Sequence, residues 1–147
     1  MAETIERILQ GKSGDIWSIA PDAIVYDAIA KMAERDVGAL LVMREQKLVG
    51  IISERDYTRK VILQGLLSRE TLVREIMTGS PITVTPASTV EECMRLMTHH
   101  RVRHLPVVDG GRVVGVVSIG DLVKAIISEQ AETIDHLHTY IGAKYPA

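Results

Sequence analysis

The sequence predicts an α/β protein, with α+β character, made of two tandem β-α-β-β-α repeats related by a pseudo-two-fold axis, with extra helices at both ends. The first observation behind this prediction is that the chain aligns with itself. Residues 19–56 match residues 84–121 without a gap, and 10 of the 38 aligned pairs are identical. The second observation is that both copies show the same order of apolar patterns. Two copies are too few for an open solenoid, so we expect a closed pair.

Each copy opens with a short strand followed by an amphipathic helix. The strands are expected at residues 16–19 and 82–84, and a proline shortly after each strand prevents its continuation. In the helices that follow, apolar residues recur at helical spacing, and Ser88 or Thr89 can cap the second helix. The apolar positions are Val25, Ile29, Met32 and Ala33 in the first copy, and Val90, Met94 and Met97 in the second.

Two apolar runs joined by a polar turn follow the helix in each copy. They read "GALLVM" and "KLVGII" in the first copy, and "HLPVV" and "RVVGVV" around "DGG" in the second. Asp-Gly or Gly-Gly between β-branched runs is a strong hairpin signal. A second helix, "ERDYTRKVILQGL" or "IGDLVKAIISEQAETIDHLHTYI", completes each copy. A unit of about 60 residues buries little surface alone, so we expect the two copies to pack together as one body.

We divide the chain into an N-terminal helix (1–11), repeat one (12–67), repeat two (68–128) and a C-terminal helical extension (129–147). An apolar stripe continues along the last helix into that extension. Such a stripe covers either the chain's own core or a partner, and two-fold homodimers are the commonest assembly. We therefore expect a homodimer formed by the terminal helices or by the faces of the repeats. The stripe consists of Ile126, Ile127, Ala131, Ile134, Leu137 and Ile141.

The composition argues against several classes of protein. The formal net charge is −2, whereas a sequence-independent nucleic-acid binder shows a basic surplus. Cys93 is the single cysteine, so neither an intrachain disulfide nor a cysteine-rich metal cluster can form. No apolar run approaches the length of about 18 residues that predicts a membrane span, and the acidic N-terminus does not resemble a signal peptide. We therefore expect a cytoplasmic protein without membrane contact.

The pattern Gly, two β-branched residues, Ser, two variable residues and Asp occurs at residues 50–56 and again at 115–121. One interpretation is helix capping, in which the Ser side chain caps the next helix and the Asp side chain reaches back. The other is a ribose-phosphate site, because a carboxylate accepts both hydroxyls of a ribose and a helix N-terminus attracts phosphate. One residue can serve both purposes, so both interpretations stay open. The residues concerned are Ser53, Asp56, Ser118 and Asp121.

These features resemble those of a CBS-domain pair, the module named after cystathionine β-synthase. The resemblance rests on the duplication, on "RVRHLPVVDGGRVVGVVSIGDL" and on "GIISERD", and it covers roughly residues 12–128. It implies a non-enzymatic regulatory module with two clefts between the copies. Such clefts bind adenosine-containing ligands, here AMP, ADP, ATP or NAD, with S-adenosylmethionine as a less frequent case. Because the sequence leaves no room for an effector domain, we expect the module to act on an unknown protein target in trans.

The resemblance implies three groups of ligand-contacting residues. Ribose and phosphate contacts fall on the two Ser-x-x-Asp motifs, with a neighbouring arginine as an additional cation, and base contacts fall on and after the first strand of each copy. Further phosphate contacts come from basic residues before the Leu-Pro pair of the second copy. The first copy has Val37, Gly38 and Ala39 there, so we expect one well-formed site and one that is weaker or empty. The expected positions are Ser53, Arg55, Asp56, Ser118 and Asp121 for ribose and phosphate, Ser18, Ile19, Thr83, Val84 and Thr85 for the base, and Arg101, Arg103 and His104 for phosphate.

Two other functions compete with this interpretation. An enzyme would need an activated nucleophile, yet neither motif serine lies in Gly-x-Ser-x-Gly. A metal site would need ligands at a recognised spacing, and His99, His100 and His104 show none, so we expect no catalytic residue and no bound metal. A structural homodimerisation module with empty clefts would show the same apolar pattern, and it remains the alternative to a ligand-binding module.

Overall fold

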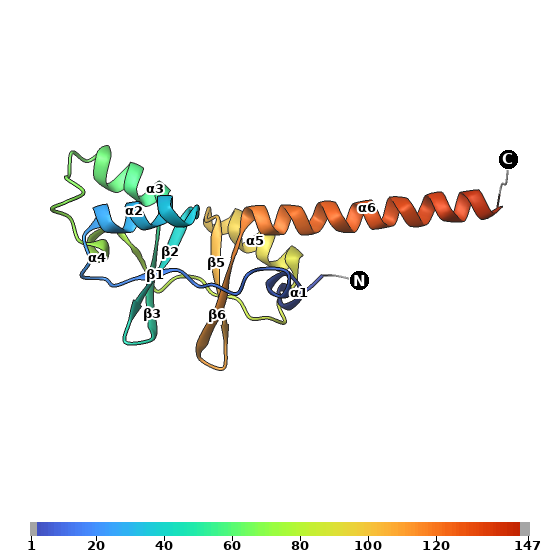
Figure 1. Cartoon of the computed structure of the whole chain (residues 1–147), viewed down its shortest axis with the longest axis horizontal. Coiled ribbons are helices and arrows are strands. Elements are labelled where there is room, and N and C mark those ends of the chain that lie inside the picture. The colour runs from blue at the N-terminus through green and yellow to red at the C-terminus, as the bar shows by residue number, and fades with distance from the viewer. Residues whose placement is uncertain (1–2, 145–147) are drawn as a thin grey trace.

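The computed structural model describes the backbone of residues 3–144 and the side chains of residues 3–135 and 137. Two α/β halves lie side by side, each with a β-hairpin, and the last helix projects far beyond them (Figure 1). Repeat one contains β1 (Ser18–Ile19), α2 (Val25–Arg35), β2 (Ala39–Arg44), β3 (Lys47–Ser53), α3 (Glu54–Tyr57) and the π-helix η1 (Thr58–Ile62). Repeat two contains α5 (Val90–His100), β5 (His104–Asp109), β6 (Arg112–Ser118) and α6 (Ile119–Lys144). The remaining elements are α1 (Ile5–Gln10), α4 (Val73–Ile76) and β4 (Thr78–Gly79).

The duplication predicted from the sequence is confirmed element by element. The first helix, both hairpin strands and the second helix of repeat two each begin 65 residues after their counterparts in repeat one. Both hairpins are antiparallel, and both turn through two residues with positive φ. The turn of repeat two uses Gly110 and Gly111, while repeat one holds Glu45 and Gln46 in the same left-handed region at φ 49° and 69°. The mixed α/β fold class is therefore as expected.

The first strand of each copy is shorter than predicted. Only Ser18 and Ile19 pair with β2, in parallel, and repeat two retains a single parallel bridge between Val84 and Val107. A proline explains the difference between the copies. In repeat one the Leu41 N–H donates to the Trp17 carbonyl at 3.1 Å, but the residue equivalent to Leu41 is Pro106, which has no N–H to donate.

The second helix also differs between the copies. In repeat one a helix was expected over "ERDYTRKVILQGL", but four α-helical residues (α3) lead into η1, which ends at Ile62. In repeat two α6 runs for 26 residues. At the start of the repeat-two helix α5, Thr89 is the capping residue, since its Oγ1 accepts from the Glu92 N–H at 3.1 Å.

Each repeat has its own apolar core, and each core includes a helix from the segment that precedes the other repeat. The core of repeat one contains Val73 and Ile76 of α4, and the core of repeat two contains Ile5 of α1, which is fully buried. The other buried members are Val25, Ala28, Met32, Leu40, Val42, Ile52 and Val61 in repeat one, and Val84, Val90, Cys93, Met97, Leu105, Val107, Val117, Leu122 and Ala125 in repeat two.

The docking of α1 and α4 follows one scheme. Val73 donates its N–H to the Ala23 carbonyl at 2.8 Å, and Ile5 donates to the Ser88 carbonyl at 2.9 Å. Two further backbone pairs repeat in the same way: Arg74 to Pro21 corresponds to Glu6 to Pro86, and Val25 to Thr71 corresponds to Val90 to Glu3. The two short helices are therefore structural equivalents. Helix α1 precedes repeat one but packs on repeat two, and α4 precedes repeat two but packs on repeat one, so the two helices are exchanged between the repeats. The numerical domain boundaries given above remain predictions.

Two identical glycines of the repeats mark where these helices press on the hairpins. A Cβ at Gly50 would lie 2.6 Å from Sδ of Met77, directly after α4, and 2.8 Å from the Thr78 carbonyl oxygen. A Cβ at Gly115 would lie 2.7 Å from Cδ2 of Leu9 in α1. Close packing of the exchanged helices therefore gives a physical reason for glycine at both positions.

The C-terminal stripe leaves the core part-way along α6. Leu122 and Ala125 are buried and Ile126 packs partly against the core of repeat two. Beyond them Ile127, Ile134 and Leu137 are 60%, 53% and 55% exposed, while the side chain of Ile141 lies outside the described residues. Among the helices within residues 3–144, none combines the length and the apolar character needed to cross a bilayer.

Candidate functional site

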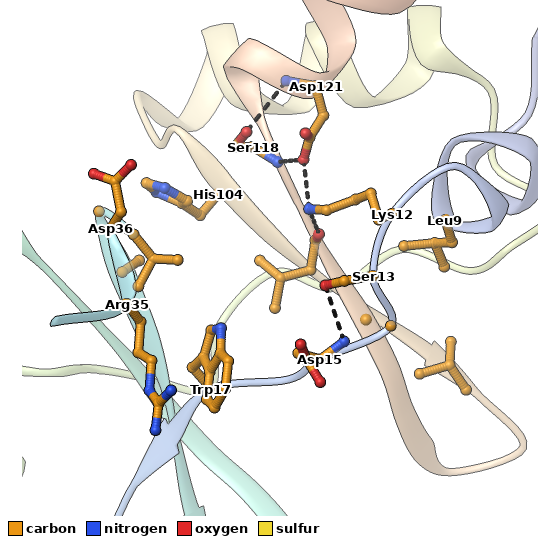
Figure 2. A pocket seen from close by; sticks show the side chains of 17 residues that line it. Leu9, Lys12, Ser13, Asp15, Trp17, Arg35, Asp36, His104, Ser118 and Asp121 are labelled. Atoms are coloured by element: carbon orange, nitrogen blue, oxygen red, sulfur yellow. Dashed lines mark hydrogen bonds and ion pairs between the residues drawn. The ribbon is translucent and has the colours of Figure 1, made fainter. Parts of the chain in front are cut away.

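A cleft of about 450 Å³ lies between the two repeats (Figure 2). Three parts of the chain line it: the linker between α1 and β1, the end of α2 with the turn into β2, and the strands of repeat two with the start of α6. Its polar lining residues are Lys12, Ser13, Asp15, Arg35, Asp36, His104, Ser118 and Asp121, and its largest apolar side chain is Trp17.

The Ser-x-x-Asp motif of repeat two lies in this cleft, at the junction of β6 and α6. The Asp121 N–H donates to Ser118 Oγ at 3.2 Å, and the Ser118 N–H donates to Asp121 Oδ2 at 2.8 Å. Ser53 and Asp56 form the same reciprocal pair at the junction of β3 and α3, with distances of 3.2 and 2.9 Å. The capping interpretation is therefore confirmed for both motifs, and it leaves the carboxylates able to accept further hydrogen bonds.

Lys12 supplies the counter-ion of Asp121. Its Nζ lies 2.8 Å from Asp121 Oδ2 and also donates to the Val116 carbonyl at 2.8 Å. Burial alone would raise the pKa of Asp121, but the hydrogen bond and charge of Lys12, together with the hydrogen bonds of Ser118, hold that pKa below its usual value. The carboxylate in the cleft is therefore ionised at neutral pH.

His104 contributes a neutral ring to the cleft rather than a positive charge. Burial lowers its pKa, and the nearby charges of Lys12 and Arg103 lower it further, against the opposing effect of Asp121. The ring packs against the other repeat, 3.5 Å from where a Cβ on Gly38 would lie. At neutral pH this imidazole donates one N–H, so it can contact a phosphate oxygen without neutralising it.

An aromatic face closes another side of the cleft. Trp17 precedes β1, and the Arg35 guanidinium stacks 4.2 Å from the centre of its ring. Neither residue, nor Lys12, was identified from the sequence, since no motif marks them. Lys12 and Trp17 precede the aligned segments, so the repeat pattern does not reach them. The one sequence feature near Lys12 is the pair of flanking glycines, Gly11 and Gly14.

The structure brings three of the expected ligand-contacting residues into this cleft: Ser118, Asp121 and His104. Arg55, beside the other motif, donates to the Arg101 carbonyl at 3.2 Å, so α3 meets the end of α5. The remaining positions do not line this cleft, and their roles stay predictions. Ser18 and Ile19 form β1, Val84 is buried in the repeat-two core, Thr83, Thr85, Arg101 and Arg103 are exposed, and Ser53, Arg55 and Asp56 lie at the start of α3.

Two observations concern the side chains that metal binding or nucleophilic chemistry would need. Within it no three His, Cys, Asp or Glu side chains converge as metal ligands. Burial, aided by the charge of Glu92, raises the pKa of the Cys93 thiol to about 11. That thiol is therefore protonated at neutral pH and is a weak nucleophile.

A duplicated β-α-β-β-α unit, with a Ser-x-x-Asp motif at each second helix and a cleft between the copies, defines a paired α/β fold. The model of the CBS domain matches residues 12–63 and 73–128, and the chain belongs to the CBS-domain family. CBS domains are generally regulatory, non-catalytic modules.

Known proteins of this family resemble the chain over most of its length. It is 45% identical to the CBS domain-containing protein CBSX3, mitochondrial, of Arabidopsis thaliana, over 97% of this chain and 73% of that protein. A putative signal-transduction protein with CBS domains from Burkholderia ambifaria is 49% identical, with a TM-score of 0.84 over 86% of this chain and 96% of the other. Because the Arabidopsis protein is named as mitochondrial, a cytoplasmic location remains a prediction for this chain.

A third similarity concerns the fold alone. The CBS domain pair of protein MJ0100 superposes with a TM-score of 0.77 at 24% identity, covering 88% of this chain and 99% of that chain. That structure contains 5′-methylthioadenosine and S-adenosyl-L-methionine.

Proposed function

We propose that the protein is a regulatory module that binds an adenosine-containing nucleotide in the cleft at Ser118 and Asp121 and acts on a partner protein in trans. The observation that carries the proposal is an ionised carboxylate, fixed by the start of a long helix, inside a cleft of about 450 Å³. A carboxylate so placed accepts the two hydroxyls of a ribose. Trp17 offers a face on which a base stacks, and the N-terminus of α6 favours a negatively charged group.

The charges of the lining favour a ligand with few phosphates. Asp15, Asp36 and Asp121 carry negative charge, against Lys12 and Arg35 with positive charge. We therefore place AMP ahead of ADP and ATP, with NAD and S-adenosylmethionine as further candidates. The adenosyl ligands of the MJ0100 pair support the choice of adenosine only to the extent that the two proteins share a fold.

A ligand panel tests this proposal. Trp17 is the single tryptophan, so its fluorescence reports on the cleft during titration with AMP, ADP, ATP, NAD or S-adenosylmethionine, with GMP as the control for the base. A ligand at 100 times its Kd should stabilise the protein by about 2.7 kcal/mol and raise Tm by roughly 5 to 11 °C. If no compound changes either the fluorescence or Tm, the ligand-binding proposal fails and the structural dimerisation module becomes the better description.

The exposed residues of α6 favour homodimerisation as a second function. Val123, Ile127, Ile134 and Leu137 lie at spacings of four, seven and three residues, so they occupy d, a, a and d positions of a heptad pattern in which Gln130 holds the intervening d position. They are 41–60% exposed. Beyond the core of repeat two, α6 projects from the body of the protein (Figure 1). Isoleucine at a positions with leucine at d favours two-stranded association. We propose that α6 pairs with α6 of a second copy.

Replacing Ile127 and Ile134 together by glutamate should convert the dimer into a monomer, because four charges would then face one another in the seam. Sedimentation velocity measures the change, from twice the chain mass of 16.2 kDa to that mass. Ser128→Glu adds a charge to the same helix outside the a/d positions and should leave the dimer intact. A wild-type chain that sediments as a monomer, or a double variant that stays dimeric, would contradict pairing through α6.

A further inference from the structure

Both motif carboxylates have a lysine counter-ion, but the two lysines come from unrelated parts of the chain. Lys60 Nζ lies 3.1 Å from Asp56 Oδ1 and is one helical turn further along the same helical segment. Lys12 lies 109 positions before Asp121 and reaches it from the linker between α1 and β1. Each lysine also donates to a backbone carbonyl, that of Ile76 at 2.9 Å or that of Val116 at 2.8 Å. The two ion pairs are thus alike in chemistry and different in origin.

Repeat two cannot supply its own lysine at this place. The residue that corresponds to Lys60 is Ala125, which is only 8% exposed and belongs to the apolar core. Lys12 provides the cation instead, from the linker between α1 and β1. In this linker Gly14 adopts φ +82°, and no other atom lies within 4 Å of the position that a Cβ at Gly14 would take. The linker joins α1, which packs on repeat two, to β1, which belongs to repeat one. Lys12 therefore belongs to an irregular linker, whereas Lys60 belongs to a helical segment.

Resting on the nucleotide site proposed above, we propose that Lys12 is a specificity-determining residue that selects adenosine ligands with an anionic 5′ group. In the free cleft Lys12 neutralises Asp121. When the ribose hydroxyls take over the Asp121 oxygens, Lys12 turns to the 5′ phosphate and forms a second charge-assisted contact there. A neutral nucleoside breaks the same ion pair without replacing it, so it binds more weakly.

The remaining charges around the cleft agree with this role. Arg35, the other positively charged side chain among the lining residues that the structure describes, stacks on Trp17 and lies 3.8 Å from Glu34. His104 is neutral at neutral pH because burial lowers its pKa. Lys12 is consequently the cation that already reaches the carboxylate expected to hold the ribose (Figure 2).

The test compares AMP with adenosine, two ligands that differ only in the 5′ phosphate, by titration of Trp17 fluorescence. Lys12→Met should weaken AMP binding by about 10- to 100-fold, the value of a hydrogen bond between charged groups, and leave adenosine binding unchanged or stronger. Lys12→Arg should keep the preference for AMP. Lys60→Met removes the matched lysine and should leave the ratio of the two affinities as in the wild type.

The possible outcomes separate the two proposals. If Lys12→Met weakens AMP and adenosine by the same factor, Lys12 only supports the structure, and the inference is wrong while the nucleotide site stands. If neither ligand binds the wild type, the inference about Lys12 fails, and the ligand panel described above decides whether the nucleotide site stands. The variant itself is expected to fold, because the Lys12 side chain is 38% exposed and an ion pair of this kind contributes about 0 to 1 kcal/mol.

Discussion

Replacing Ile5 by alanine is expected to lower the free energy of unfolding by about 2–5 kcal/mol, the usual cost of truncating a fully buried isoleucine. Ile5 is 0% exposed and belongs to the core of repeat two, although 79 residues separate it from Val84, the next core member along the chain. The backbone around it is also fixed, since its N–H donates to the Ser88 carbonyl at 2.9 Å. A short N-terminal helix is therefore as important to repeat two as one of its own elements.

Urea unfolding at equilibrium measures this effect, and thermal unfolding should show a fall in Tm of roughly 4 to 20 °C. Ile62→Ala is the matched control, because Ile62 is 56% exposed and surface substitutions of this kind change stability by about 0.5 kcal/mol or less. Equal stability of the two variants would show that α1 is not part of the core.

Asp121→Ala is expected to weaken binding of the adenosine ligand by about 100-fold or more, because two hydrogen bonds from ribose hydroxyls to a charged acceptor are lost. Asp56→Ala is the matched control. Each aspartate caps its helix through the equivalent serine, so both variants lose about 1 kcal/mol of capping and are comparable in stability. The difference between their affinities then reports on the ligand alone, and Asp56→Ala should change the affinity less than threefold.

Calorimetric titration of both variants distinguishes the two clefts. Loss of binding in Asp56→Ala with retention in Asp121→Ala would place the ligand at the motif of repeat one, where Arg55 and Arg101 meet. Equal binding in both variants would mean that neither carboxylate holds the ribose, contrary to the proposed site.

The features that the sequence predicted correctly depend on local patterns. The hairpins and the first helix of each repeat follow from apolar periodicity. Because the chain is duplicated, the same pattern supports each of these elements in both repeats. The capping role of Ser53 and Ser118 is likewise local, because cap and partner lie three residues apart. The first strand of repeat two was predicted too long, since the effect of Pro106 depends on which strand lies beside it.

The features that the sequence did not reveal depend on contacts between distant segments. The equivalence of α1 and α4 is hidden because Ile5 and Val73 are 68 residues apart, whereas the repeats themselves are 65 apart. An ungapped comparison therefore stops before these helices. Lys12 and Trp17 lie in the same region, and only tertiary packing brings them to Asp121 and Arg35.

The exchange of α1 and α4 gives this single chain the connectivity of an arm-swapped dimer whose two subunits have been fused end to end. Cutting the chain between the repeats would leave each half carrying the helix that the other half needs. We therefore expect that neither repeat can unfold while the other stays folded, so that the two unfold in one cooperative transition. The linker that carries Lys12 is one of the two connections that cross between the repeats. A ligand that moves Lys12 would therefore act on a segment that holds the two repeats together.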